Sequence, residues 1–260
     1  MKLIFIRHGD PDYINDSLTE KGVEEAKALS EHICSLGIDV VYQSPLGRSL
    51  KTAGYSLEKL GIPATTLDWL EEFPARFNPN ISPSAREAYR PALKLSADGK
   101  LYEKRIVWDM LPSYYADHPE LFDRYAWRES EIAECSDMLR VYDHVAQSFI
   151  TLLAGYGYEK KGDVFKVTEG SSKTLAFFCH FGITSVFLSV LWNVSPFIPL
   201  QFLAMAPTSV TELASEEREK GTAIFRTLRI GDISHLSLSG LKPSFSARFC
   251  ERFENEDERH

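Results

Sequence analysis

The order of short apolar segments and amphipathic helices near the start of the chain constrains the fold most. Residues 2–6 predict a short buried strand, and residues 39–43 predict a second one. Between them, residues 23–36 repeat apolar side chains at helical spacing, and Ser17 or Thr19 can cap the start of this helix. A strand, a helix and a strand in this order predict parallel strands joined by a right-handed crossover.

A second helix is expected directly after the second strand. Ser44 is typical of a helix N-cap and Pro45 of the first helical position. An apolar stripe over residues 46–60 supports the helix, and residues 64–67 predict a third strand. Arg48 is therefore expected in the first helical turn, where unpaired backbone N–H groups favour an anion.

The later elements extend the same pattern. We expect a long helix over about residues 130–153, and further strands at residues 201–206, 209–213 and 223–230. Residues 174–179 are apolar throughout, which is typical of a strand covered on both faces. The predicted fold class is α/β, a three-layer α/β/α sandwich with a mostly parallel sheet. One domain is expected over residues 1–250, followed by a charged tail at 251–260.

The regular alternation of predicted strands and helices stops between about residues 73 and 129. Prolines and aromatic residues punctuate this stretch instead of strands and amphipathic helices. Two interpretations remain open, a peripheral helical insertion packed by its own aromatic side chains and a cap that acts as a lid over a substrate pocket.

Composition excludes several classes of protein. The 260 residues carry a formal net charge of −8, which argues against a surface that binds nucleic acid. The four cysteines are scattered without the spacing of a zinc site, so reduced thiols are expected. The longest apolar run, residues 181–192, is too short to span a bilayer, and a first strand at Lys2 leaves no room for a signal peptide. We therefore expect a cytoplasmic protein without a membrane segment.

Four polar side chains share one structural context in this prediction. Arg7 and His8 follow the first strand, Arg48 lies in the first turn after the second strand, and His180 follows the strand at residues 174–179. If these strands belong to one parallel sheet, the four side chains leave the same edge. Two arginines, two histidines and two helix N-termini are suited to binding a tetrahedral dianion.

At this point the sequence resembles the histidine phosphatase superfamily, also called phosphoglycerate mutase-like. The resemblance covers roughly residues 1–72 and 130–236 in the same order. The matching motifs are Arg7-His8-Gly9, Leu18-Thr19-x-x-Gly22, Ser44-Pro45-x-x-Arg48 with Thr52-Ala53, Leu70-x-Glu72, His180-x-Gly182 and the segment from Gly231 to Leu236.

The resemblance implies a role for each matched residue. His8 would be the nucleophile that forms a phosphohistidine, and Arg7, Arg48 and His180 would bind the phosphoryl oxygens. No cofactor and no metal is implied. A carboxylic acid must protonate the leaving oxygen, and Glu72 matches the family position better than Glu71.

The chain departs from the family pattern in the first loop. Many members have an asparagine six residues after the first histidine, where this chain has Ile14, so Asn15 is at most a displaced phosphate ligand. A metal cluster of His8, Asp10 and Asp12 is an alternative interpretation of the same segment.

These observations predict a phosphomonoester hydrolase acting on a small phosphorylated metabolite. A cofactor-dependent phosphoglycerate mutase and a catalytically silent module that binds phosphate or a phosphopeptide are the two alternatives. The identity of the substrate is expected to depend on residues 73–129.

Overall fold

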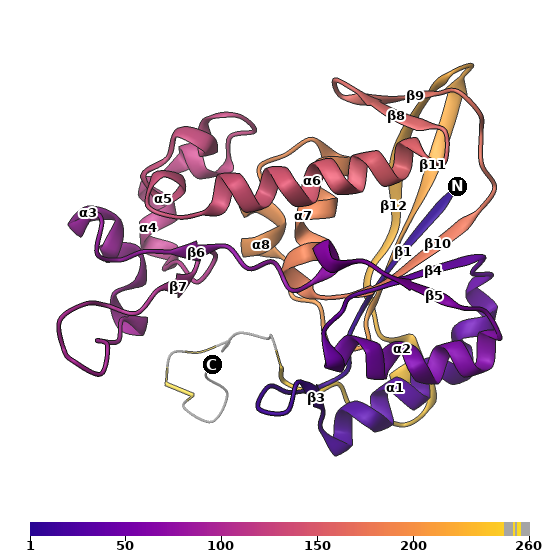
Figure 1. Cartoon of the computed structure of the whole chain (residues 1–260), viewed down its shortest axis with the longest axis horizontal. Coiled ribbons are helices and arrows are strands. Elements are labelled where there is room, and N and C mark those ends of the chain that lie inside the picture. The colour runs from indigo at the N-terminus through magenta and orange to yellow at the C-terminus, as the bar shows by residue number, and fades with distance from the viewer. Residues whose placement is uncertain (247–251, 253, 256–260) are drawn as a thin grey trace. The chain divides into compact units, whose positions relative to one another are not determined.

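A mixed eight-stranded sheet forms the centre of the computed structural model, which describes residues 1–246, 252 and 254–255 (Figure 1). The strand order is β5-β4-β10-β1-β11-β12-β9-β8. Four neighbouring strands are parallel: β1 (Lys2–Arg7), β4 (Val40–Gln43), β5 (Ala64–Thr66) and β10 (Thr174–Cys179). Helices flank this sheet, which confirms the predicted α/β class.

Two helices cover one face of the parallel strands, as Figure 1 shows: α1 (Glu20–His32), which continues into a 3-10 turn (Ile33–Leu36), and α2 (Gly47–Leu60). The Thr19 hydroxyl caps α1 by accepting from the Gly22 backbone N–H, as one of the two predicted caps. Side chains such as Ile4, Leu29 and Ala53 form a fully buried core between these helices and the sheet. This packing fixes where the parallel strands end.

The start of α2 differs from the prediction. Leu46 is the N-cap residue and lends no side-chain hydrogen bond, so the helix begins at Gly47 and not at Pro45. The Ser44 hydroxyl instead accepts from the Leu46 backbone N–H at 3.2 Å and lies 2.8 Å from a ring nitrogen of His180. A long-range partner has thus displaced the local capping role that the Ser-Pro pair suggests.

The other half of the sheet is antiparallel: β8 (Tyr158–Lys161), β9 (Val164–Val167), β11 (Val210–Glu219) and β12 (Thr222–Asp232). The strands predicted at 209–213 and 223–230 are confirmed within β11 and β12. The strand predicted at 201–206 is wrong, because helix α8 (Phe197–Phe202) extends into it and Pro207 lacks the N–H that a ladder needs. The hairpin of β8 and β9 was not predicted, although Gly162 marks its turn.

The chain forms two compact units, of which the first contains the sheet and spans residues 1–72, 150–184 and 204–260. The second unit comprises residues 73–149 and 185–203. Its elements are short apart from two helices shared with the first unit: β6 (Arg76–Phe77), β7 (Arg105–Ile106), α3 (Pro83–Arg86), α4 (Pro112–Asp117), α5 (Glu131–Glu134), α6 (Met138–Ala154), α7 (Phe181–Trp192) and α8. A lid role for residues 73–129 stays a prediction.

The long helix predicted over residues 130–153 is wrong in one respect, because it is broken into α5 and α6. Residues 135–137 leave the helix to pair with the segment around β6. The Asp137 carboxylate accepts from the Arg76 backbone N–H at 2.6 Å, and the Cys135 carbonyl accepts from the Asn78 N–H at 2.8 Å. These bonds replace the helical ones, and the apolar period continues across the break, so the sequence pattern conceals it.

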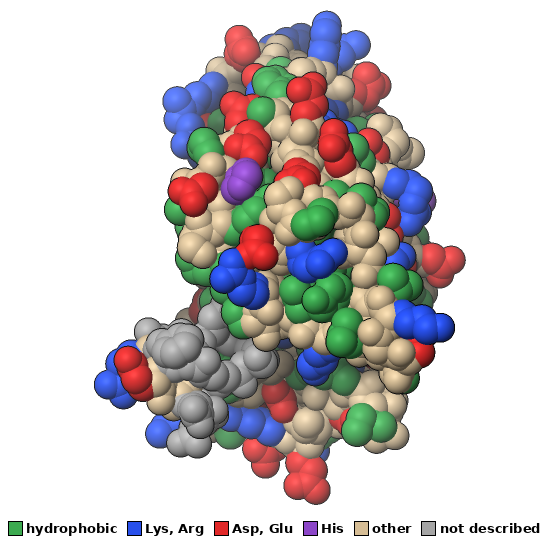
Figure 2. Space-filling view, turned by 90° about the vertical axis from the view of Figure 1, so that its left-hand side faces the viewer, with side chains coloured by type: hydrophobic (Ala, Val, Ile, Leu, Met, Phe, Trp, Pro, Cys, Tyr) green, Lys and Arg blue, Asp and Glu red, His purple; other side chains and the backbone are tan. Residues whose placement is uncertain are grey.

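Charged side chains of both signs are interspersed on the face that Figure 2 shows, and hydrophobic side chains occur there in small groups. This face therefore presents no field of a single sign. Among the described residues, no helix is both long and apolar enough to cross a membrane. The predicted charged tail at 251–260 lies largely outside the described residues.

Candidate active site

The ends of β1 and β10 carry the predicted arginine and histidines to one edge of the sheet. Arg7 ends β1 in register with Cys179, the last residue of β10. The His8 backbone N–H donates to the Cys179 carbonyl at 3.0 Å, so His8 and His180 leave neighbouring strands side by side. Their ring centroids lie 5.0 Å apart. This is the edge at which open parallel α/β sheets bind ligands.

The hydrogen bonds of His8 fix which ring nitrogen carries the proton. Nδ1 lies 2.7 Å from the Gly9 carbonyl oxygen, which can only accept, so Nδ1 is the protonated nitrogen. The lone pair is therefore on Nε2, and the Arg48 Nε–H donates toward it across 3.4 Å. A neutral imidazole with a directed lone pair is the form in which histidine acts as a nucleophile.

The environment of His8 keeps the ring neutral. Burial lowers its pKa well below the usual value, and the positive charges of Arg7 and Arg48 act in the same direction. The hydrogen bond to Gly9 opposes these effects but does not outweigh them. His8 therefore remains unprotonated at neutral pH.

Two glycines allow the loop after His8 to lie against the start of α1. A Cβ atom on Gly9 would meet the Gly22 carbonyl oxygen at 2.6 Å, and one on Gly22 would meet the Asp10 carbonyl oxygen at 2.2 Å. The Gly9 N–H also donates to the Thr52 hydroxyl on α2 at 2.9 Å. The glycines of the first two motifs are thus explained by close backbone approach.

Arg48 lies in the first turn of α2, as predicted, and is almost completely buried. Its Nη1 donates to the Asp16 carboxylate at 2.7 Å, while the other Asp16 oxygen accepts from the Gly47 N–H at 2.6 Å. Partial burial raises the pKa of Asp16, but the hydrogen bonds from Gly47 and Arg48 have the larger combined effect, so the pKa of Asp16 is lowered. Asp16 therefore orients Arg48. Asp16 was not predicted, because no local signal in the sequence marks a loop aspartate as the partner of a distant arginine.

Backbone carbonyls hold Arg7 at the same edge. Its Nη1 donates to the carbonyls of Met205 at 2.6 Å and Ser246 at 3.1 Å. Its Nε is buried and has no hydrogen-bond partner among the residues that the structure describes. Burial lowers the pKa of Arg7, but an arginine keeps its charge at physiological pH.

His180 presents a ring nitrogen that is available to a ligand. Its Nε2 lies 2.8 Å from the Ser44 hydroxyl, which also accepts from the Leu46 N–H. When this hydroxyl donates to Nε2, the proton of the His180 ring is on Nδ1. This nitrogen is buried without a hydrogen-bond partner in the described part of the chain. An oxyanion placed there would accept from it.

Glu72 faces the site and Glu71 faces solvent, as the resemblance suggests. The Glu72 carboxylate accepts from the Gly182 N–H in the first turn of α7 at 3.0 Å, two residues after His180. Glu71 is exposed. Glu72 is thus the carboxyl group that the structure places beside the two histidines.

One ligand atom from each of His8, Glu72 and His180 lies within 4.8 Å of the others, a spacing that a metal ion could use. The charge of the site argues for an anion instead, because Arg48 donates toward the His8 lone pair and Arg7 adds a second positive charge. Asp12, part of the alternative metal cluster, accepts from the backbone N–H groups of its own turn.

Asn15 does not join the other predicted residues. It is exposed, and its side-chain amide donates to the Asp12 carboxylate at 2.7 Å within the turn between β2 (Pro11–Asp12) and β3 (Ser17–Leu18). From the same turn, Asp16 and Tyr13 contact Arg48.

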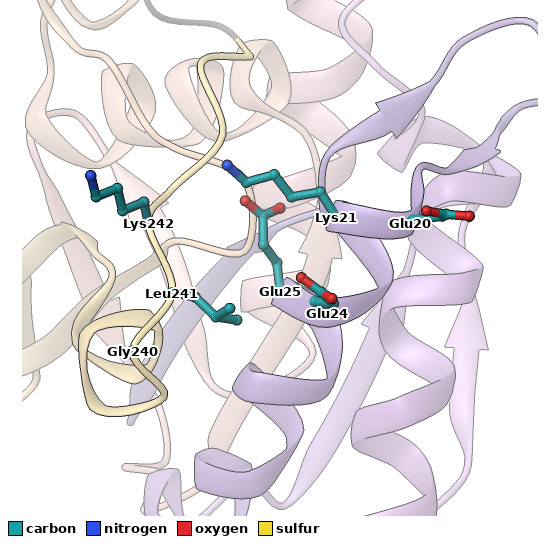
Figure 3. A pocket seen from close by; sticks show the side chains of 7 residues that line it. All are labelled: Glu20, Lys21, Glu24, Glu25, Gly240, Leu241 and Lys242. Carbon is teal, nitrogen blue, oxygen red and sulfur yellow. The ribbon is translucent and has the colours of Figure 1, made fainter.

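A buried carboxylate on α1, that of Glu25, supports the loop after His8. Glu25 accepts from the Asp10 N–H and from the Ser244 N–H, each at 2.9 Å. Burial raises its pKa, although the two hydrogen bonds favour the charged form. Figure 3 shows Glu25 lining a pocket of about 420 Å³ between the start of α1 and the segment at residues 240–242. Glu25 thus couples Ser244, just after that segment, to the loop after His8.

The Gly231–Leu236 motif reaches the site through Thr208. The Thr208 backbone N–H donates to the His8 carbonyl at 3.1 Å, and its hydroxyl lies 3.0 Å from Nε2 of His235. Thr208 has a φ of 59°, which is uncommon for a β-branched residue, so its contacts must hold it there. Burial lowers the pKa of His235 to about 4.

The fold and the site together define a protein suited to hold a tetrahedral anion beside a neutral histidine. The family model of the histidine phosphatase superfamily (branch 1) matches residues 3–91, which include Arg7, His8, Arg48 and Glu72. The family model thus confirms, over residues 3–91, the resemblance to this superfamily noted in the sequence.

Curated relatives match only part of the chain. The 2,3-bisphosphoglycerate-dependent phosphoglycerate mutase 2 of Lactiplantibacillus plantarum is 38% identical over 25% of this chain and 34% of its own length. The corresponding mutase of Haemophilus ducreyi is 37% identical over 23% of this chain and 31% of its own length. The matched stretch thus spans about a third of these relatives.

Solved structures match over most of the chain. A mycobacterial glucosyl-3-phosphoglycerate phosphatase in complex with inorganic phosphate has a TM-score of 0.54 at 18% identity and covers 90% of this chain and 98% of its own. A phosphoserine phosphatase from Entamoeba histolytica has a TM-score of 0.53 at 15% identity, with 90% and 98% covered. These similarities establish a shared fold.

Proposed function

We propose that the protein is a phosphomonoesterase that acts through a phosphohistidine on Nε2 of His8. The observation that carries this proposal is the hydrogen bond between His8 Nδ1 and the Gly9 carbonyl, which leaves a neutral, buried Nε2 lone pair beside Arg48. A module that only binds phosphate has no need of an unprotonated histidine or of a carboxyl group such as Glu72.

In the first step, Nε2 of His8 attacks the phosphorus atom of the substrate. A P–N bond forms and the P–O bond to the leaving group breaks, while a protonated Glu72 gives its proton to the leaving oxygen. Arg7, Arg48 and the Nδ1–H of His180 bind the phosphoryl oxygens and stabilise their charge.

In the second step, water attacks the phosphohistidine. Glu72, now ionised, takes a proton from that water as the P–N bond breaks, and inorganic phosphate is released. His8 returns to its neutral form, with Nδ1 still donating to Gly9. Glu72 thus regains in the second step the proton that it gives up in the first.

A small phosphorylated metabolite is the proposed substrate class. The structural neighbours whose names state a substrate are phosphatases of phosphoserine and of glucosyl-3-phosphoglycerate, both small phosphomonoesters. The names of the curated relatives favour a second candidate, a mutase that uses 2,3-bisphosphoglycerate. A mutase must retain its phosphoryl group, whereas the phosphatase releases it to water.

Hydrolysis of p-nitrophenyl phosphate by wild type, His8→Ala and His144→Ala tests the proposal. His144 is exposed on α6 and serves as the matched control. We expect turnover by wild type and the control and none by His8→Ala. Equal rates in all three proteins would refute the proposal.

Two further measurements separate the alternatives. Brief incubation with a ³²P-labelled substrate should give an acid-labile label on wild type that His8→Ala lacks, whereas a binding module would give none. Isomerisation of 3-phosphoglycerate in the presence of 2,3-bisphosphoglycerate, with little release of inorganic phosphate, would identify a mutase instead.

A further inference from the structure

The turn between β2 and β3 is a built structure that fixes one aromatic side chain. The Asp12 carboxylate accepts from the backbone N–H groups of Ile14 at 3.1 Å and Asn15 at 3.2 Å, and from the Asn15 side chain. Asp16 closes the turn with a φ of 44° and holds Arg48 and the N-terminus of α2. Tyr13 is therefore presented from an anchored turn.

Tyr13 lies between the buried site and solvent. Arg48 is 8% exposed, and its guanidinium carbon lies 5.5 Å from the centroid of the Tyr13 ring. The Tyr13 side chain is nevertheless 68% exposed, so most of its surface is open while part of it faces Arg48. An aromatic ring in this position shields the guanidinium through a cation–π contact.

The leaving group of a bound phosphomonoester is expected beside this ring. Its phosphoryl group would be held by Arg7, Arg48 and His180, which are buried, so its leaving group would point toward solvent. The open surface of Tyr13 lies next to Arg48. A planar leaving group would stack on that surface, and a short alkyl group would gain much less contact.

The charge of the same turn disfavours acidic leaving groups. Residues 10–16 contain no lysine or arginine, and Asp16 is paired with Arg48, which leaves the carboxylates of Asp10 and Asp12. Hydrogen bonds from Asn15 are the main cause that lowers the pKa of Asp12, which keeps this carboxylate charged at neutral pH. A carboxylate or second phosphate on the leaving group would meet this charge at close range.

We propose that Tyr13 is a specificity-determining residue and that the site selects phosphomonoesters with an uncharged aromatic leaving group. The proposal rests on the proposed function for its substrate, but its test does not depend on turnover. Neither the phosphoglycerates of the curated relatives nor phosphoserine belongs to this class, because each carries a carboxylate.

Binding of two phosphonates, which cannot be hydrolysed, tests the proposal by calorimetry. Phenylphosphonate and ethylphosphonate share the phosphoryl group and differ in the stacking surface. We expect Tyr13→Ala to weaken phenylphosphonate by roughly three- to tenfold relative to ethylphosphonate, which is the usual value of one aromatic pair. Tyr13→Phe should preserve the ratio of the two affinities, since the ring is retained.

Ile14→Ala is the matched control, because Ile14 is the next residue of the same turn and is 96% exposed. It should preserve the ratio as well. An equal loss for both phosphonates in Tyr13→Ala would mean that Tyr13 only positions Arg48, and would overturn the proposal. An altered ratio in Tyr13→Phe would do so too, because the hydroxyl would then be the selective group.

These outcomes are distinct from failure of the proposed function. If wild type binds both phosphonates but hydrolyses no phosphomonoester, the phosphatase is refuted while the affinity ratios still test Tyr13. Tighter binding of 3-phosphoglycerate than of phenyl phosphate to the catalytically inactive His8→Ala variant would refute the inference about charge.

Discussion

The hydroxyl of Ser44 is predicted to determine which ring nitrogen of His180 carries the proton. Its removal in Ser44→Ala leaves His180 Nε2 without its hydrogen-bond partner at 2.8 Å. The ring proton is then free to move to Nε2, and Nδ1 loses its role as a fixed donor to an oxyanion.

The magnitude follows from the cost of an unpaired buried group. A net hydrogen bond contributes about 1 kcal/mol, and a buried polar atom left without a partner costs about 1 to 3 kcal/mol. Applied to the transition state, this range corresponds to a loss of roughly 5- to 150-fold in kcat/KM. The loss is expected mainly in kcat, because the donor matters most where phosphoryl charge develops.

Ser49→Ala separates this effect from general destabilisation. Ser49 is also buried, and its hydroxyl donates at 2.8 Å to the Phe178 carbonyl, near the end of the strand that His180 follows. Both variants should lower the free energy of unfolding by about 1 kcal/mol in urea titrations. If Ser44→Ala loses no more kcat/KM for p-nitrophenyl phosphate than Ser49→Ala, the argument about the His180 tautomer is wrong.

Two further predictions concern residues behind the site. Because burial lowers the pKa of His235 to about 4 in the folded state, the unfolded chain binds the proton first, and stability falls as the pH drops below about 6.5. Between about pH 6.5 and about pH 4.5, wild type should lose about 2 kcal/mol more in urea titrations than His235→Gln, and parallel curves would contradict this. Glu25→Gln should cost about 1 to 3 kcal/mol because an amide cannot accept from both N–H groups, whereas Glu24→Gln, exposed beside the same pocket, should cost almost nothing; equal thermal shifts would count against a supporting role for Glu25.

Local signals in the sequence predict the part of the site that follows from strand ends. The strands that end at Arg7 and Cys179 can be recognised from the sequence, because each is a short apolar run followed directly by polar residues. Parallel strands in one sheet then bring His8 and His180 to the same edge, and the structure adds that the two strands are neighbours. The cap of α1 at Thr19 could also be predicted from the sequence, because its partner, the Gly22 N–H, lies within the same helical turn.

Contacts between residues far apart in the chain explain the remainder. Ser44 has the local appearance of a helix cap, but its hydroxyl bonds to His180, 136 residues away. Asp16 and Glu25 act through partners outside their own element, and neither belongs to a pattern with a period. The break between α5 and α6 depends on Asn78 and Arg76, which a helical pattern cannot reveal.

Two buried donors provide the final argument that the site is completed by an anion. Arg7 Nε and His180 Nδ1 both lack hydrogen-bond partners within the described residues, and each such group costs about 1 to 3 kcal/mol. Apolar replacements would remove this cost, so a purely structural role does not account for either group. A phosphoryl dianion would accept from donors of this kind and offset the positive charge of Arg7 and Arg48. The free energy that these two donors cost in stability is thus available for binding an anion.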